Sequence, residues 1–171
     1  ALEDDPDDRE AAWGLFLHGS RAETLRAVRA AEEWQPFIAL GQQILTWDPH
    51  NTTVLANLGI ALFSANQHHA AEEQLRGAVD AAEAQGATAQ LLEAREYLGR
   101  TLMALGRYDE AEQVLAKNSA LWDDAGEERR YYRGCPFQAL GELYDKTGRP
   151  EQATEAFLRA AHFDMAGPSS A

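Results

Sequence analysis

The sequence is poor in cysteine, and it has no long apolar run. Cys135 is the single cysteine among 171 residues, so neither an intramolecular disulfide nor a cysteine-based metal site can form from it. We interpret Cys135 as a small packed side chain. No stretch of about 18 apolar residues is present, so no membrane-spanning helix is expected. Sustained apolar–polar alternation and Asn-Gly or Asp-Gly turns are also missing, which predicts a chain without strands.

Positive charge is scarce as well. Lys and Arg number 15 and Asp and Glu number 28, which gives a net charge of −13. Nucleic acids and anionic membranes are bound by clusters of Lys and Arg, so both are disfavoured as partners. The acidic excess fits a solvated surface, a basic partner or a salt-rich cytoplasm. Only Lys117 and Lys146 are lysines, and this preference for arginine is typical of GC-rich bacterial genomes.

A motif of two helices joined by a short turn occurs three times. In its clearest copy, residues 97–115, Gly106 ends the first helix, and Gly99 on that helix faces Ala111 on the second. In every copy the small residue of the second helix follows the glycine of the first by 12 positions, and a large apolar residue follows 4 later. The first-helix glycines are 40 and 42 positions apart, which indicates a helical solenoid. The three sets are Gly59, Ala71 and Leu75; Gly99, Ala111 and Leu115; and Gly141, Ala153 and Phe157.

The motif resembles the tetratricopeptide repeat, a helix pair of 34 residues. The copy that starts near Gly134 matches the family pattern at Phe137, Leu140, Gly141, Tyr144, Gly148, Ala153, Phe157 and Ala160. Departures occur at Arg95 and Asn118 in the preceding copy, and at Asn66, where glycine is usual. The extra six and eight residues per unit resemble the long-helix variants of the family. The resemblance implies an all-α, right-handed α-solenoid of antiparallel helix pairs with about eight or nine helices.

These matches suggest a division of the chain into units. Residues 1–19 form an N-terminal helix, read either as the end of a preceding repeat or as an acidic N-terminus, and residues 20–51 form a degenerate repeat. Residues 52–165 hold three repeats, about 52–91, 92–133 and 134–165, and residues 166–171 form a flexible tail. In the degenerate repeat, Asp48-Pro49 predicts that residues 36–47 form the second helix of the unit. In an alternative register Phe37 to Gly41 belong to a first helix, because they resemble Phe137 to Gly141. The expected helices are 7–18, 20–33, 36–47, 52–65, 68–85, 88–105, 108–124, 127–147 and 150–165, with Gly134 and Pro136 either interrupting the eighth or marking its start.

No catalytic, cofactor-binding or metal-binding motif is found in the sequence. His68 and His69 are adjacent, so on a helix they point about 100° apart and do not readily share one metal ion. His68 stands where the family has a packed tyrosine, which predicts a packing role. No phosphate-binding glycine loop, zinc-protease motif or nucleophile elbow is present. We therefore expect a protein that is not an enzyme and has no cofactor.

The family resemblance places a binding groove on the first helix of each unit. Its inward positions include Ile60, Glu93, Met103 and Asp145. Tyr97 and Phe63 are candidate apolar anchors, and Arg100 and Asn57 are candidates to hold a peptide backbone or carboxylate. The co-chaperone pattern that grips a terminal carboxylate is matched only at Asn57, and Glu93 would repel that group. The candidate groove residues are Arg26, Asn57, Phe63, Glu96, Tyr97, Arg100, Gln138 and Glu142.

The function expected from this resemblance is a protein-interaction scaffold that binds a peptide or helix of a partner protein in its concave groove. The alternative is a ligand-sensing or oligomerising module of a larger regulator. The terminal helices are rich in alanine and can pair with a second copy of the chain, so a homo-oligomer is also considered. The chain begins at Ala1 and shows no signal peptide, so a removed leader or upstream domain stays open. The compartment is not fixed, and a cytoplasmic location is favoured.

Overall fold

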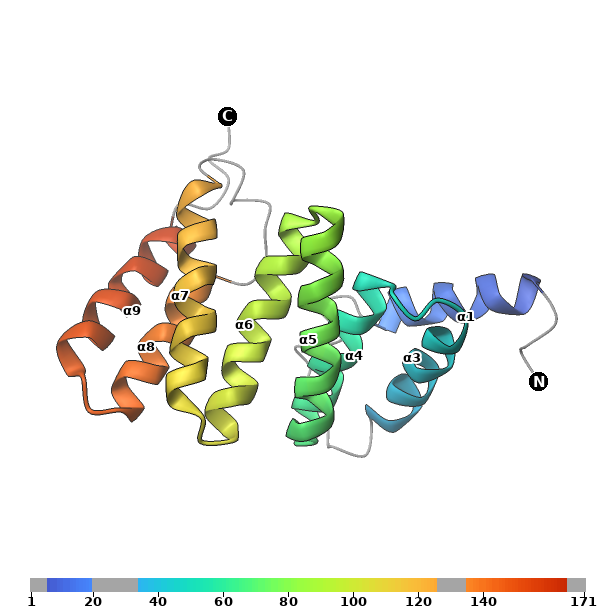
Figure 1. The fold of residues 1–171 in the computed structure, drawn as a ribbon, viewed down its shortest axis with the longest axis horizontal. Helices are drawn as coiled ribbons and strands as arrows, with labels where there is room; N and C mark the ends of the chain where they lie inside the picture. The colour runs from blue at the N-terminus through green and yellow to red at the C-terminus, as the bar shows by residue number, and fades with distance from the viewer. Residues whose placement is uncertain (1–5, 20–33, 126–134, 166–171) are drawn as a thin grey trace.

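The described part of the chain is entirely helical. The computed structural model describes residues 6–19, 34–125 and 135–165, and these ranges contain eight α-helices and no strand (Figure 1). The all-α solenoid of helix pairs predicted from the sequence is confirmed. The helices are α1 (Pro6–Gly19), α3 (Gln35–Trp47), α4 (Thr52–Ser64), α5 (His68–Gln85), α6 (Thr88–Ala104), α7 (Tyr108–Asp124), α8 (Pro136–Lys146) and α9 (Pro150–Met165).

Residues in the left-handed conformation follow four of the described helices, α4, α5, α6 and α8. Gly86, Gly106 and Gly148 have φ angles of 65°, 76° and 74°, a conformation that glycine adopts without steric cost. Asn66 takes the equivalent place in the α4–α5 turn with a φ of 59°. Asparagine is among the few other residues that tolerate this region, which explains the departure from glycine there.

The repeated glycines permit close contact between the two helices of each pair. A Cβ atom placed on Gly59 would lie 2.5 Å from Leu75 Cγ, and one on Gly99 would lie 2.6 Å from Leu115 Cδ2. On Gly141 it would lie 2.5 Å from Phe157 Cδ1. In each pair, therefore, the large apolar residue 16 positions after the glycine fills the space that a side chain would need.

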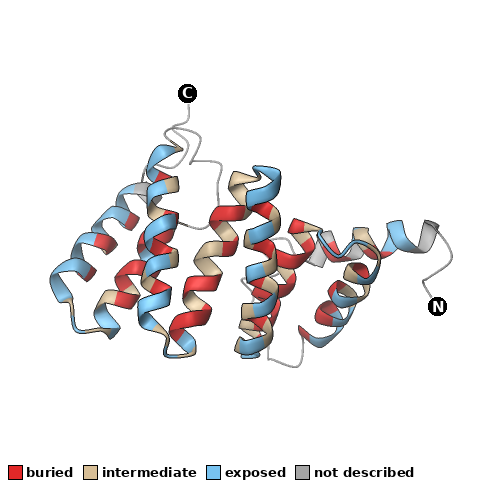
Figure 2. Cartoon of the chain, viewed as in Figure 1, coloured by how far each residue is buried: buried red, intermediate tan, exposed pale blue. Residues whose placement is uncertain are grey.

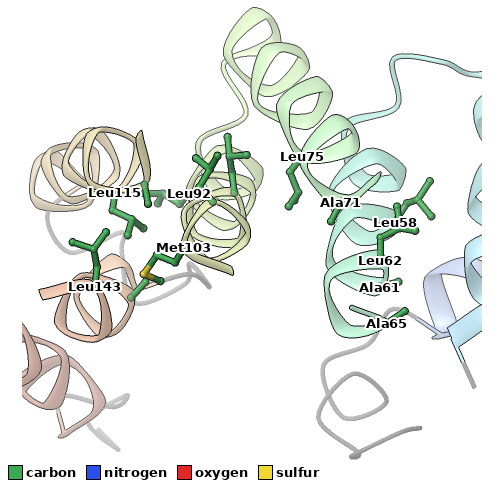
Figure 3. Packing of buried hydrophobic residues seen from close by; sticks show 14 of the residues in the cluster. Leu58, Ala61, Leu62, Ala65, Ala71, Leu75, Leu92, Met103, Leu115 and Leu143 are labelled. Carbon is green, nitrogen blue, oxygen red and sulfur yellow. The ribbon is translucent and has the colours of Figure 1, made fainter. Parts of the chain in front are cut away.

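One continuous apolar core runs along the row of helices. Leucine is its commonest residue, and the buried leucines come from α4 to α8 (Figure 3). Charged side chains cover the outside of α5, α7 and α9, where pale exposed residues predominate (Figure 2). The fully buried leucines include Leu58, Leu75, Leu92, Leu102, Leu115 and Leu143. Each helix thus buries its apolar face against its immediate neighbours, as expected for a repeat array.

Two of the expected helices overlap residues that the structure does not describe. Of the expected span 127–147, the described part begins at residue 135, and the helix α8 within it begins at Pro136. Proline is well placed there, because the first helical residue needs no hydrogen bond from its nitrogen. The expected helix over 20–33 and the segment 126–134 lie outside the described residues.

The helix α3 connects the N-terminal end of the array with the repeats. It packs against α1 on one side and α4 on the other. A Cβ on Gly41 would lie 2.9 Å from Phe16 Cε2 and 3.4 Å from Leu58 Cδ1, so this glycine sits where three helices meet. Phe16 in turn stacks on Phe37 with ring centroids 4.4 Å apart.

Candidate protein-interaction face

The first helices of the three repeats form a surface of their own. Close backbone approaches join α4 to α6 and α6 to α8, and no comparable approach joins α5 to α7 or α7 to α9 among the described residues. The first helices are therefore spaced more tightly than the second helices. We call the surface of α4, α6 and α8 that carries Phe63, Glu96, Tyr97, Arg100, Gln138 and Glu142 the first-helix face.

Arg100 connects two helices of this face. Its Nε donates a hydrogen bond to Glu96 Oε1 at 3.0 Å, one turn back on α6. Its Nη1 donates to Glu142 Oε2 on α8 at 2.7 Å. Gln138 Nε2 donates to the other oxygen of Glu142 at 3.1 Å. The fold thus brings together four of the candidate residues, although Arg100 and Glu142 are 42 positions apart in the chain.

This network contains more negative than positive charge. Burial raises the pKa of Glu96, and the nearby carboxylates of Glu93 and Glu142 raise it further, although Arg100 acts in the opposite direction. Burial acts to lower the pKa of Arg100, but Glu96 and Glu142 outweigh burial and raise it. Glu96 and Glu142 therefore flank one guanidinium, with Glu93 close to Glu96, and the network retains a net negative charge.

An aromatic pair joins α4 to α6 beside this network. The ring centroids of Phe63 and Tyr97 are 5.9 Å apart and the rings are close to perpendicular, an edge-to-face geometry that favours attraction between aromatic rings. His68 lies 5.5 Å from Phe63, and its half-buried ring agrees with the packing role predicted for it. Tyr97 is close enough to Arg100 to influence its pKa, so the aromatic pair and the Arg100 network are contiguous.

Other predicted positions are placed differently. Arg26 lies outside the described residues. Asn57 is half-buried on α4 and has no part in the Arg100 network or in the aromatic pair. Ile60 and Met103, expected to line a groove, are only 2% and 7% exposed. Both belong to the core, because the apolar faces of α4 and α6 are wide enough to include these positions.

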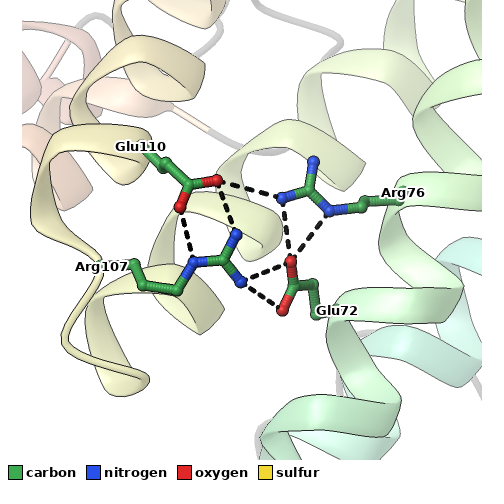
Figure 4. Close-up of polar contacts among 4 residues, drawn as sticks. All are labelled: Glu72, Arg76, Arg107 and Glu110. Carbon is green, nitrogen blue, oxygen red and sulfur yellow. Dashed lines mark hydrogen bonds and ion pairs between the residues drawn. The ribbon is translucent and has the colours of Figure 1, made fainter.

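Sequence reasoning missed a set of ion pairs that joins successive second helices. Both Nη1–Oε distances between Arg107 and Glu72 are 2.7 Å, and Arg76 and Glu110 complete a cluster of four charges (Figure 4). Arg107 comes directly after the turn glycine of one repeat, and Glu72 lies on the second helix of the repeat before it.

The same contact recurs one repeat further along. Arg149 donates to Glu112 at 2.8 and 2.9 Å, again from the residue after a turn glycine. We call the two pairs Glu72–Arg107 and Glu112–Arg149 the Glu–Arg ladder. Its signal in the sequence is a Gly-Arg pair at each turn with an Ala-Glu pair on the preceding second helix, at spacings of 35 and 37 residues.

Two absences concern the described part of the chain. Within residues 6–19, 34–125 and 135–165, no group of three or more His, Cys, Asp or Glu side chains is arranged to hold a metal ion. None of the helices described there combines the length and the apolar character needed to cross a membrane.

The fold defines the class of protein first. It is an α-solenoid of helix pairs, and the solved structure titled "Crystal structure of MamA" superposes on it with a TM-score of 0.66. That match covers 96% of this chain and 82% of the other at 18% identity, so it establishes a shared fold alone. No curated protein matches the chain in sequence.

The sequence then defines the family. A family model described as tetratricopeptide repeat matches residues 88–161, and a second model with the same description matches residues 52–84. The chain belongs to the tetratricopeptide repeat family. Repeats of this family typically build protein-interaction scaffolds without enzymatic activity, and this is the general class of function that the matches support.

Proposed function

We propose that the protein is a non-enzymatic scaffold that binds a segment of a partner protein on its first-helix face. The observation that carries this proposal is the convergence of side chains from three successive first helices. Phe63 on α4 meets Tyr97 on α6, and Arg100 on α6 meets Glu142 on α8. Partly exposed aromatic and arginine side chains held in fixed positions are the residue types that dominate binding energy at protein interfaces.

The spacing of the helices supports the same face. Tighter spacing of α4, α6 and α8 than of α5, α7 and α9 bends a row of helices toward the first-helix side. A surface on the inside of such a bend contacts an extended or helical segment over several repeats at once. The opposite side is already covered by the Glu–Arg ladder and other ion pairs between second helices.

Site-specific photo-crosslinking in a lysate of the source organism tests the proposal. A photoreactive phenylalanine analogue is placed at Gln138 on the first-helix face, or at Lys117 on α7 as the matched control. Both positions are exposed, so neither replacement disturbs the core. We expect a discrete partner band from position 138 and none from position 117, and mass spectrometry then identifies the partner.

Two results would contradict the proposal. A band from position 117 alone would place binding on the second helices, and no band from either position would argue against a scaffold role. Once a partner is in hand, Tyr97→Ala gives an independent check, because loss of its ring should weaken binding about tenfold or more. A thermal unfolding curve of Tyr97→Ala shows whether that loss reflects the face or the fold.

A further inference from the structure

The structure assigns a different role to Arg100 from the one expected from the sequence. The Nε and Nη1 atoms of its guanidinium already donate within the protein, to Glu96 at 3.0 Å and to Glu142 at 2.7 Å. The Arg100 side chain is only 21% exposed. A partner carboxylate that approached Arg100 would come close to the carboxylates of Glu96 and Glu142, which would repel it. The first-helix face is therefore unsuited to an acidic partner segment.

The charges that surround Arg100 point to the opposite chemistry. Among the described residues, the face carries the carboxylates of Glu93, Glu96, Glu142 and Asp145 against the cations Arg100 and Lys146, which follows Glu142 by four residues on α8, so four negative charges less two positive charges leave −2. The helix α4 contributes no charged residue. Glu142 is 35% exposed, and Asp145 is exposed one turn further along α8, so both carboxylates are accessible to a partner.

The neighbouring aromatic pair adds a second element of recognition. Tyr97 is half-buried and lies beside Arg100, with its ring edge-to-face against Phe63. A cation over the face of a tyrosine ring is attracted to the ring electrons, and carboxylates nearby add to this attraction. The apolar stem of a lysine or arginine side chain packs well on such a ring while its charged end reaches an acid.

We propose that the first-helix face binds a basic segment of a partner protein, with a lysine or arginine side chain of that segment seated between Tyr97 and the carboxylates of Glu142 and Asp145. This inference rests on the proposed function and names the chemistry of its partner. Each oxygen of Glu142 already accepts one hydrogen bond, from Arg100 or Gln138, and a carboxylate oxygen has room for a second. Arg100 and Gln138 thus hold Glu142 in place for the incoming cation.

Selection from a displayed library of short linear peptides on the immobilised full-length protein tests the inference before the natural partner is identified. We expect the enriched peptides to contain lysine or arginine and to be depleted in aspartate and glutamate. The affinity of the strongest basic peptide should fall about tenfold in Glu142→Gln and in Asp145→Asn, because each variant removes one charge-assisted contact. Both substitutions keep the shape of the side chain, and unchanged unfolding curves confirm that the fold is retained.

The matched control is Glu73→Gln on α5, which removes one exposed negative charge far from the first-helix face. It should leave peptide affinity unchanged, whereas non-specific attraction to an acidic protein would weaken all three variants equally. Equal weakening would overturn the inference. Enrichment of acidic or uncharged peptides would also overturn it, yet leave the scaffold function standing. If no peptide is enriched, both the inference and the proposed binding of linear segments fail.

Discussion

At the scale of single residues, glycines decide how closely the helices of a pair approach. Gly99 faces Leu115 so closely that an added Cβ would lie 2.6 Å from both Cγ and Cδ2 of that leucine. Gly77 lies inside α5, where an added Cβ would be 3.6 Å from the nearest side-chain atom of Leu55, an ordinary contact distance. The same substitution should therefore have opposite effects at the two positions.

We expect Gly99→Ala to lower the free energy of unfolding by about 1–3 kcal/mol, since overpacking outweighs the gain in helix propensity. Gly77→Ala should raise it by about 0.5–1 kcal/mol, because alanine restricts the unfolded chain and favours the helix. Urea unfolding followed by circular dichroism measures both. A stabilised Gly99→Ala variant would show that the pair α6–α7 can separate without cost.

Glu96 provides a second residue-scale prediction. Its raised pKa means that the folded protein holds the carboxylate less favourably than the unfolded chain does. This cost to stability is present above the folded pKa and disappears as the pH falls below the ordinary value of about 4.3. Glu96→Gln should therefore be more stable than the wild type at neutral pH, and the difference should vanish at about pH 4. Lower stability of the variant at neutral pH would mean that the bond to Arg100 outweighs burial.

At the scale of secondary-structure elements, the Glu–Arg ladder joins each second helix to the turn of the next repeat. Arg107 and Arg149 each bind a glutamate of the preceding repeat through two short hydrogen bonds. These pairs are partly exposed, so dissolved salt screens them. Arg107→Gln should lower the urea midpoint at low ionic strength, and the difference from the wild type should narrow in about 1 M salt. An unchanged difference would indicate that Arg107 acts through packing of its stem.

The pH dependence of the same contact has a definite sign. Burial acts to raise the pKa of Glu72, but hydrogen bonds from Arg76 and Arg107 outweigh burial and lower it. The stabilisation is fully present above the ordinary glutamate pKa and is lost as the pH falls through the lowered value. Glu72→Gln should thus be less stable than the wild type at neutral pH and equal to it in acid. Exposed Glu73→Gln on the same helix is the control, and a pH-independent deficit for Glu72→Gln would contradict the prediction.

At the scale of the whole molecule, repeat arrays owe their stability to contacts between neighbours. The helix α6 packs against α4, α5, α7 and α8, whereas the principal packing partner of α9 is α8. Opening α9 therefore breaks fewer contacts than opening α6. We expect native-state hydrogen exchange to be faster in α9 than in α6, because the free energy of opening α9 should be lower by a few kcal/mol. Equal protection of both helices would show that the array unfolds as one cooperative unit.

Much of the fold could be predicted from the sequence, because its determinants are local or strictly periodic. Gly106 and Gly148 end helices by their own conformational freedom, and no distant residue is needed for that effect. The spacing from glycine to large apolar residue fixes which side chains meet within a helix pair, since the turn between the two helices is short. Thus the contact between Gly99 and Leu115 follows from residues 16 positions apart.

Only the tertiary structure determined which side chains of one repeat contact those of the next. Arg100 meets Glu142 and Glu72 meets Arg107 across 42 and 35 positions, and such contacts depend on how far each helix pair is rotated against its neighbour. Sequence spacing does not determine that rotation, so the sequence predicts Arg100 as a group open to a ligand where the structure pairs it twice. The burial of Ile60 and Met103 depends on the same rotation. The sequence by itself therefore determined the helix pairs, and only their stacking determined the charge and accessibility of the first-helix face.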